Sequence, residues 1–497
     1  IPNPLAMVRF KDKNFERNVF NGNIFAEFDI LAGLKLRITG GANVSNTKSN
    51  QYLYKKDFVG NADQGHAKVR MVTAYNYINE NMLTYTKKIK SHRLNLTGVF
   101  SQEFYKFDMM LADAQQFANE NLTYFDLYSA EQHNPTRTIY RDQRRFSYIS
   151  RANYQYANKY LVTGIFRADG NSRFAENNKF GYFPSISFGW RISNESFIKE
   201  NFPAIYNMKL RLGLGRTGNP GIDTYASLPK YENDFYILNG SPATAYASTS
   251  MGNADLKWET TDELNTGLDL ALWGGRLNMT MDAYSKMTKD LLLIERLPYS
   301  SGYASTWNNV GMVSNKGLEF SINARAVEKK DFTISAGINF GYNENVVEDD
   351  AGSADVLFRH SNGALHINNT IILREGEPLG SFYGYKYLGV WQEDEAEQAA
   401  LYDVTPGGGI KAEPGDPRFL DVNNDSILDD EDKMILGHAL PKINYGINLR
   451  MRYKNFQLTA SGYGAWGHKI FNLPRVKLEN NGGGMALRSV LDAWRAP

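Results

Sequence analysis

The sequence predicts an all-β chain that forms part of an antiparallel transmembrane β-barrel. Three observations predict this fold class: apolar and polar residues alternate with a period of two, short turns alternate with long connections, and aromatic residues are frequent in a polar chain. We expect short periplasmic turns and long extracellular loops, as in bacterial outer-membrane barrels. The pattern contains roughly 14 to 16 strands, whereas a barrel that encloses a plug needs about 22. The chain is therefore expected to supply only part of a barrel.

The alternation is clearest in a hairpin that begins at Asp262. From Asp262 to Trp273, mostly Leu side chains at even positions share one face of the strand, while Asn265, Gly267 and Asp269 share the other. After Gly274-Gly275 the pattern restarts, which indicates a tight turn. The same unit recurs in three further hairpins, which turn at Asn158-Lys159, Lys329-Lys330-Asp331 and Lys454-Asn455.

Long connections separate these hairpins. They run over residues 218–258, 289–312, 343–371 and 390–442. Connections of this length are uncommon in compact soluble domains but normal on the extracellular side of a barrel. A string of β-sandwich domains is the alternative, although its strands usually have about five or six residues. Many strands predicted here are longer, as a tilted membrane-crossing strand must be.

The composition fits a barrel with a wet interior. Tyr (30) and Phe (28) lead an aromatic content of 13%, yet the mean hydropathy is −0.45. A barrel accounts for both values, because half of each strand faces lipid, half faces water, and aromatic side chains gather at the membrane interfaces. Lys and Arg total 55 against 54 Asp and Glu, so no basic excess indicates nucleic acid as a partner.

Several residue types and segments exclude other classes. The chain has no Cys, which excludes a disulfide framework, a thiolate metal site and a Cys nucleophile. The longest aliphatic run, Leu291 to Ile294, is far shorter than the about 20 apolar residues of a membrane helix. Ile1 to Pro4 lack the features of a signal peptide, so we expect the numbering to begin inside a longer precursor.

Several segments resemble the TonB-dependent transporters of the SusC/RagA class. The resemblance covers nearly the whole chain and is strongest in residues 160–163 (YLVT), 167–174 (RADGNSRF) and 181–191 (GYFPSISFGWR). Further similar segments are 3–6 (NPLA), 79–85 (NENMLTY), 216–219 (RTGN), 256–260 (LKWET), 315–319 (NKGLE) and 376–385 (GEPLGSFYGY).

This resemblance implies a fold, a location and partners. The family barrel has about 22 strands, is a multi-pass protein of the cell outer membrane, and imports oligosaccharides or peptides with energy from TonB. A SusD-like surface lipoprotein caps it, and the implied assembly is a dimer of transporter-lipoprotein pairs. The family's N-terminal plug has no counterpart before Ile1, and the chain stops at Pro497 before the family's closing strands. Residues 1–497 are therefore expected to be an incomplete barrel domain in contact with outer-membrane lipid.

One segment, residues 421–432 within the long extracellular loop at about 390–442, has the spacing of a Ca²⁺-binding loop. Ser426 stands where such a loop normally needs Gly, and Asp432 is shorter than the usual Glu. The alternative is a solvated acidic loop without an ion. If Ca²⁺ binds, it would rigidify the loop. The expected ligands are Asp421, Asn423, Asp425 and Asp432 through their side chains and Ile427 through its carbonyl, with Asp429 at the ninth position.

Other motifs are weaker. Gly213 to Gly218 fit the dinucleotide pattern G-x-G-x-x-G, but the following Asn219-Pro220-Gly221 favours a turn rather than the required helix. We therefore expect these glycines in a strand with a bulky neighbour. The seven His residues, among them His360 and His366, show no metal-ligand spacing, and the acidic run at 348–350 is expected to be solvated.

The aromatic residues Tyr383, Tyr385, Tyr387, Trp391 and Trp307 lie near a strand end or in a long loop. Their faces would suit stacking against a sugar or a peptide, but we interpret them as residues of the membrane-interface girdle. The sequence thus assigns no substrate-binding and no catalytic residues. We expect no enzymatic activity.

Three functions remain open on the sequence. The first is TonB-dependent import of oligosaccharides or peptides, the second is a passive porin or a structural barrel subunit of a larger envelope complex, and the third is a secreted β-rich adhesin or carbohydrate enzyme. A plug with a TonB box upstream would distinguish the first from the second. Fractionation would identify the third, because only a barrel stays in the detergent-extracted outer membrane.

Overall fold

The computed structural model describes residues 4–238, 240–349, 356–358, 370–404, 409–479, 487–492 and 494. Contacts between residues divide the chain into two units, which are described separately below. The first unit comprises residues 1–188, 215–260 and 292–309, and the second comprises residues 189–214, 261–291 and 310–497.

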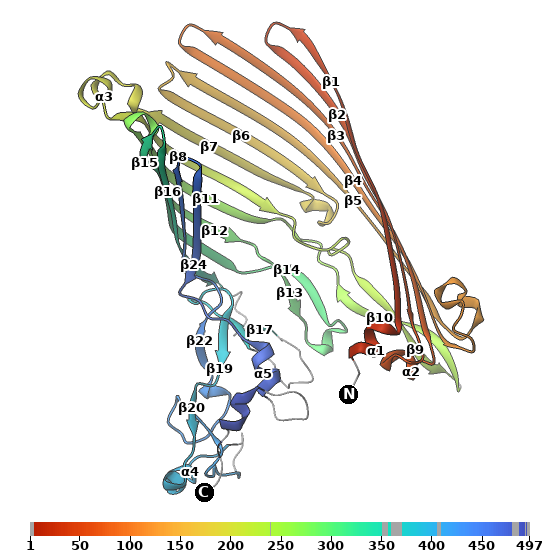
Figure 1. The fold of residues 1–497 in the computed structure, drawn as a ribbon. Helices are drawn as coiled ribbons and strands as arrows, with labels where there is room; N and C mark the ends of the chain where they lie inside the picture. The colour runs from red at the N-terminus through yellow and green to blue at the C-terminus, as the bar shows by residue number, and fades with distance from the viewer. Residues whose placement is uncertain are drawn as a thin grey trace. The chain divides into compact units, whose positions relative to one another are not determined.

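Within the described residues, fourteen strands form one hydrogen-bonded sheet whose neighbours follow the order of the chain (Figure 1). The paired strands are antiparallel, with long registers such as Lys11–Leu53 to Leu31–Leu34 in the first pair, which is interrupted only between Asp29 and Leu31. The strands are β1 (Lys11–Leu31), β2 (Leu34–Leu53), β3 (His66–Ile89), β4 (His92–Phe117), β5 (Ala130–Tyr156), β6 (Tyr160–Asn171), β7 (Phe180–Arg191), β8 (Ile205–Asn219), β11 (Glu259–Leu272), β12 (Leu277–Lys289), β15 (Met312–Lys329), β16 (Phe332–Asp349), β23 (Ile443–Tyr453) and β24 (Phe456–Trp466).

The strands of the first unit are much longer than a membrane requires. Strands β3, β4 and β5 contain 24, 26 and 27 residues, whereas about 9–11 residues cross a bilayer. At about 3.4 Å per residue, β5 extends over roughly 90 Å. Most of this length therefore lies outside the hydrocarbon region, and on the side of the long loops, because the opposite ends meet in short turns.

The short turns lie at one end of the hairpins. The turn between β1 and β2 contains Gly33, whose φ is +84° and whose carbonyl accepts a hydrogen bond from the Thr86 amide at 2.8 Å. A Cβ atom at this position would lie 2.3 Å from the Thr86 carbonyl oxygen. Both the backbone conformation and the lack of space therefore require glycine here. The four hairpins predicted from the sequence are all present, as β5–β6, β11–β12, β15–β16 and β23–β24.

The long loops contain secondary structure of their own. In the first unit, β9 (Lys230–Leu238), β10 (Ser241–Met251), β13 (Leu292–Arg296) and β14 (Ser305–Asn309) form a small sheet. In the second unit, β17 (Val356–Phe358), β18 (Ile371–Leu373), β19 (Ser381–Gly384) and β22 (Met434–His438) form another, and β20 (Tyr387–Val390) pairs with β21 (Pro417–Phe419). The α-helices are short: α1 (Pro4–Arg9), α2 (Phe58–Ala62), α3 (Ser196–Asn201), α4 (Ala396–Ala399) and α5 (Leu473–Glu479).

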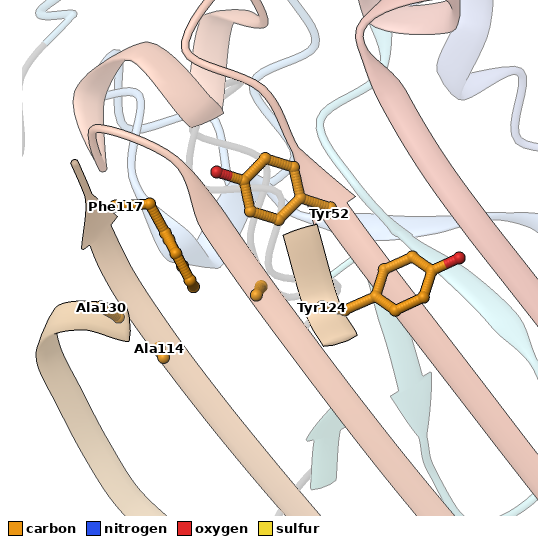
Figure 2. Close-up of a cluster of buried hydrophobic side chains, with 6 residues drawn as sticks. Tyr52, Ala114, Phe117, Tyr124 and Ala130 are labelled. Carbon is orange, nitrogen blue, oxygen red and sulfur yellow. The ribbon is translucent and has the colours of Figure 1, made fainter. Parts of the chain in front are cut away.

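A compact core covers the long-loop ends of β2 to β5 in the first unit (Figure 2). Its larger side chains are Tyr52, Phe117 and Tyr124, and the Tyr52 and Phe117 rings meet edge to face with centroids 5.3 Å apart. The three small residues Ala67, Ala114 and Ala130 complete it. The strand ends outside the membrane are therefore held by ordinary hydrophobic packing rather than by lipid.

None of the described helices combines the length and the apolar character needed to cross a bilayer.

The glycine motif at 213–218 lies entirely within β8, as expected for a strand rather than a nucleotide-binding turn. A Cβ atom at Gly218 would lie 2.1 Å from the ring of Phe183, and one at Gly215 would lie 3.1 Å from the Ser185 Cβ. These two glycines therefore make room for side chains of the neighbouring strand, which confirms the predicted packing role.

Candidate functional site

One face of the first five strands carries a row of polar side chains. Asn43 donates a hydrogen bond to Asn21, the Asn76 amide donates to Glu103 at 3.1 Å, and the Arg145 Nε donates to the same carboxylate at 2.9 Å. The registers place these contacts side by side across β1 to β5. Such a continuous polar face is what the water-filled interior of a barrel requires.

Aromatic side chains gather on the opposite face and near the short turns. In the first unit, Phe100 and Tyr148 lie with ring centroids 5.0 Å apart, and Tyr156 stacks on Tyr160 beside the turn. In the second unit, Phe332, Tyr453 and Phe456 are direct cross-strand neighbours, also beside short turns. The exposed aromatic residues beside the turns, Tyr156, Tyr453 and Phe456, are typical of the girdle at a membrane interface.

The second unit also has a charged cluster on its polar face. The Arg211 guanidinium of β8 lies between two carboxylates, with Nε 3.0 Å from Asp269 and Nη1 2.9 Å from Asp282. A Cβ atom at Gly267 would lie 2.6 Å from Arg211 Nη2, so this glycine leaves room for the guanidinium. The sequence placed Gly267 and Asp269 on the polar face but did not reveal their shared partner Arg211.

A cavity of about 330 Å³ opens beside the polar row of the first unit. Strands β4 and β5 and the loops 172–179 and 220–229 contribute its walls. It is lined by Glu103, Tyr105, Phe107, Arg141, Gln143, Arg145, Arg173, Asp223 and Thr224. The sequence did not reveal this site, because alternation along β5 places Arg141 and Arg145 on one face but only the folded loops bring Arg173 and Asp223 beside them.

The predicted Ca²⁺ loop forms a tight series of turns in the second unit. Asp421 accepts backbone hydrogen bonds from Asn424 at 2.7 Å and from Ser426 at 2.9 Å, and Asp425 accepts one from Ile427 at 2.8 Å. Ser426 has a φ of +63°. The backbone therefore makes the left-handed turn that normally uses Gly, in spite of the Ser side chain.

The expected ligands only partly converge. The Asn423 amide nitrogen lies 3.0 Å from Asp425 and 3.2 Å from Glu431, a carboxylate that the sequence pattern did not single out. Asp432 is fully buried, and its two carboxylate oxygens accept backbone hydrogen bonds from Val422 at 2.8 Å and Asp429 at 3.0 Å. In the described part of the chain, no three His, Cys, Asp or Glu side chains form a metal-binding group.

Neighbouring charges and hydrogen bonds lower the pKa of two carboxyl groups in this loop. The ammonium group of Lys433, 2.5 Å from Asp430, lowers the pKa of that exposed carboxyl below its usual value. A backbone hydrogen bond from Gly409 and one from Lys411 likewise lower the pKa of Asp403. Both carboxylates are thus charged at neutral pH. The Asp430 carboxylate pairs with Lys433, whereas Asp403 is hydrogen-bonded to the 421–432 segment through its backbone, to Ser426 and Leu428.

Two of the aromatic residues in the loops pack against buried clusters. Trp391 is only 3% exposed and forms a small core with Ala399 and Ala412, so the girdle interpretation is wrong for this residue. Trp307 packs against another buried cluster in the first unit. The side chains of His360 and His366, and Asp350 in the acidic run, lie outside the described residues.

An antiparallel sheet with a polar face, aromatic residues beside its short turns and folded long loops defines the class of outer-membrane β-barrels. Residues 7–463 match the family described as TonB dependent receptor-like, beta-barrel. The chain belongs to this family, and its location is the outer membrane.

Several relatives resemble the chain over most of its length. It is 32% identical over 494 residues to TonB-dependent receptor P3 of Formosa agariphila, covering 99% of this chain and 49% of the relative. It is 31% identical over 488 residues to TonB-dependent receptor SusC of Bacteroides thetaiotaomicron, covering 92% and 44%. The solved RagAB peptide transporter matches with a TM-score of 0.82 at 23% identity, over 98% of this chain and 52% of that chain.

The chain therefore spans about half the length of the relatives that it matches. The predicted resemblance to SusC/RagA-class receptors and the predicted partial antiparallel barrel are confirmed. Membership also places the chain among transport receptors rather than enzymes, in agreement with the sequence-based expectation.

Proposed function

We propose that the receptor containing this chain actively imports oligosaccharides or peptides across the outer membrane, with energy from TonB. A SusD-like surface lipoprotein assists it, in a dimer of transporter-lipoprotein pairs. The observation that carries this proposal is the continuous polar face of β1 to β5, because a passage for hydrophilic cargo needs a wall that remains hydrated across the whole bilayer.

The structure on the side of the long loops supports a role in capturing cargo. Strands of 24 to 27 residues carry the cavity beyond the hydrocarbon region. A packed core stabilises the strand ends there. This architecture provides a surface on which a lipoprotein cap could rest and through which cargo could enter.

The similar proteins support the proposed cargo class and the proposed energy source. The family consists of TonB-dependent receptors, and a similar solved structure is named a peptide transporter. The oligosaccharide alternative and the SusD-like partner follow from resemblance to the SusC/RagA class. A passive porin would share the polar wall but would need neither TonB nor a lipoprotein.

Uptake in whole cells tests the proposal. Cells that express the receptor are given fluorescent oligosaccharide and oligopeptide pools, with and without deletion of tonB. We expect accumulation of at least one pool to require both the receptor and TonB. Accumulation that persists without TonB would favour the passive porin. Copurification of the receptor with a surface lipoprotein in mild detergent tests the proposed transporter-lipoprotein pair.

A second proposal concerns Ca²⁺, which we propose binds the 421–432 segment and rigidifies this loop. The Asn423 amide nitrogen lies within hydrogen-bond distance of both the Asp425 and the Glu431 carboxylates, and oxygen donors are the ligands that Ca²⁺ prefers. Glu431 is an addition to the predicted ligands, which also include Asp421, the Ile427 carbonyl and Asp432. Asp432 has both carboxylate oxygens engaged by backbone amides, so it would contribute through its remaining lone pairs.

Limited proteolysis of the purified receptor tests the Ca²⁺ proposal. We expect Ca²⁺ at 10⁻⁴ to 10⁻³ M, on the order of an extracellular module's affinity, to slow cleavage within residues 390–442. The double variant Asp421→Asn, Asp425→Asn should abolish the effect. Glu397→Gln, an exposed acid in the same loop, is the matched control. Equal cleavage with Ca²⁺ and with a chelator would disprove the site.

A further inference from the structure

We propose that the cavity formed by Arg141, Arg145 and Arg173 in the first unit binds a carboxylate group of the imported molecule. This inference rests on the proposed import function and adds a chemical class to it. The carboxylate could belong to a uronic acid of an oligosaccharide or to the end or side chain of a peptide, since both present the same planar anion.

The charges in the cavity favour an anion. Glu103 is already engaged by Arg145 and by Asn76, so it neutralises one arginine. Arg141 is exposed and has no ion pair or side-chain hydrogen bond within the described part of the chain. The charge of Asp223 acts on the Arg173 guanidinium and favours its positive form. With three arginines and two acids, the lining carries one net positive charge.

Arg173 has donors that the protein does not use. Its Nη1 donates to the Pro220 carbonyl at 3.2 Å, but its Nε is buried without a hydrogen-bond partner among the described residues. A buried donor without a partner is unfavourable. The edge of a guanidinium matches a carboxylate in size and geometry and can form two parallel hydrogen bonds with it.

Burial lowers the pKa of the Arg173 guanidinium, and the charge of Arg145 lowers it further, while Asp223 partly opposes the change. The side chain thus lies in surroundings that disfavour its positive charge. A bound anion would relieve this effect. The pKa shift supports the same conclusion as the unused donor.

The cavity walls are held in place. Phe174, directly after Arg173, packs against Trp258 with ring centroids 4.9 Å apart in a buried cluster. The hydroxyl of Tyr225 in the second loop donates to Asp142 at 2.6 Å and so fastens that loop to β5. Because both loops are anchored, the backbone that carries Arg173 would not need to be ordered when a ligand binds.

The position suits contact with incoming cargo. Arg145 precedes the short turn at Ala157 by about 12 residues, or roughly 40 Å along the strand. With a strand tilt of about 40°, this is roughly 30 Å above the turn, beyond an apolar band about 25 Å tall. The cavity therefore lies on the extracellular side of the apolar band, and β5 continues past it to Ala130.

Binding to the purified full receptor tests the proposal. The probes are trigalacturonate and N-acetyl-trialanine, and their neutral counterparts are galactotriose and N-acetyl-trialanine amide. We expect at least one acidic probe to bind at least tenfold more tightly than its neutral counterpart. Arg173→Gln should remove this preference, and Arg141→Gln should reduce it in case the first variant does not fold.

The matched control is Arg144→Gln. Arg144 is next to Arg145 on the same strand but lies on the other face, over the ring of Phe104. Its substitution should therefore leave binding unchanged. No preference for either acidic probe, or a preference that survives both pocket variants, would overturn the inference. If uptake depends on TonB but the receptor shows no preference for acidic probes, the carboxylate site is disproved and the import function stands. If the receptor binds the acidic probes but uptake does not depend on TonB, the import function is disproved.

Discussion

At the scale of single residues, buried charges hold the strand ends outside the membrane. His66 is 7% exposed, with Nδ1 2.7 Å from Asp63 and Nε2 2.9 Å from Asp113. Both ring nitrogens therefore face carboxylates, an arrangement that a doubly protonated imidazole satisfies. Lys68 and Asn134 also contact Asp113. This network links β3, β4 and β5 next to the core of Figure 2.

The network predicts a dependence on pH. Burial raises the pKa of the Asp113 carboxyl, but hydrogen bonds from Asn134 and Lys68 and the charge of His66 outweigh it and lower the pKa below its ordinary value of 3.8. Asp113 lies near the long-loop end of β4, outside the membrane. Its stabilising contribution is complete above the ordinary value and is lost as the pH falls through the lower folded value. Protection of the Gln116 and Phe117 amides from hydrogen exchange, measured relative to the intrinsic exchange rate, should therefore fall only below about pH 4.

Asp113→Asn serves as the control for this prediction. The variant should lose the acid-dependent part of the protection, because an amide does not titrate. Equal loss of protection in the variant and the natural protein would show that another group is responsible.

At this scale, the sequence predicted which side of a strand is polar, but not which side chains on other strands form contacts with it. The alternation around Asp269 identified the polar side of β11 correctly. It could not find Arg211, because the contact depends on the register with a strand about 60 residues away. The arginine cavity was missed because only the folded loops bring Arg173 and Asp223 beside β5. The Ca²⁺ spacing was visible because all its residues are local, but the burial of Asp432 was not.

At the scale of elements, the longest loop has a core of its own. Trp391 packs with Tyr402 at a ring-centroid distance of 5.5 Å, and the Arg418 guanidinium lies 4.3 Å above the Trp391 ring. Arg418 also forms an ion pair with Glu395 at 3.0 Å. The loop therefore folds around this indole, independently of the membrane.

Trp391→Ala should unfold this loop locally and leave the barrel intact. Removing a buried Trp costs about 3–5 kcal/mol, which exceeds what a small loop core can tolerate. We expect rapid proteolysis within residues 390–442 and unchanged migration of the unboiled protein on a gel. Leu401→Ala, at a position 65% exposed in the same loop, should have no effect. Loss of the folded gel band in the Trp variant would contradict a self-contained loop.

Hairpins were predictable from the sequence because turn residues and alternation are local signals. The internal sheets of the loops were not. Strands β17 and β18 have three residues each, which is too short to show a period, and β10 pairs with β14 in parallel across more than 50 residues. Such pairings are decided by tertiary packing rather than by local pattern.

At the scale of the whole molecule, the strand order follows the chain. Within the described residues, neighbours in the large sheet skip only strands that belong to loops, such as β9 and β10 between β8 and β11. This topology is what repeated hairpins produce, and it explains why the fold class could be predicted while the cargo could not. Cargo depends on side chains that only the folded wall brings together.

In a transmembrane barrel wall, alternate residues of each strand contact lipid and water. Strand β23 provides a direct test, because Tyr445, Ile447, Leu449, Met451 and Tyr453 alternate with more polar residues. The chain contains no Cys, so single cysteines can be introduced and labelled with nitroxides. Collisions with oxygen report lipid, and collisions with a water-soluble nickel complex report water.

The measurement is a scan of residues 443–453 in the full receptor, reconstituted in bilayers. We expect oxygen accessibility to peak at odd positions and nickel accessibility to peak at even positions. The period should be two along the whole membrane-crossing part of the strand. Accessibility that does not alternate, or odd positions that contact water throughout, would contradict the transmembrane wall on which the account is built.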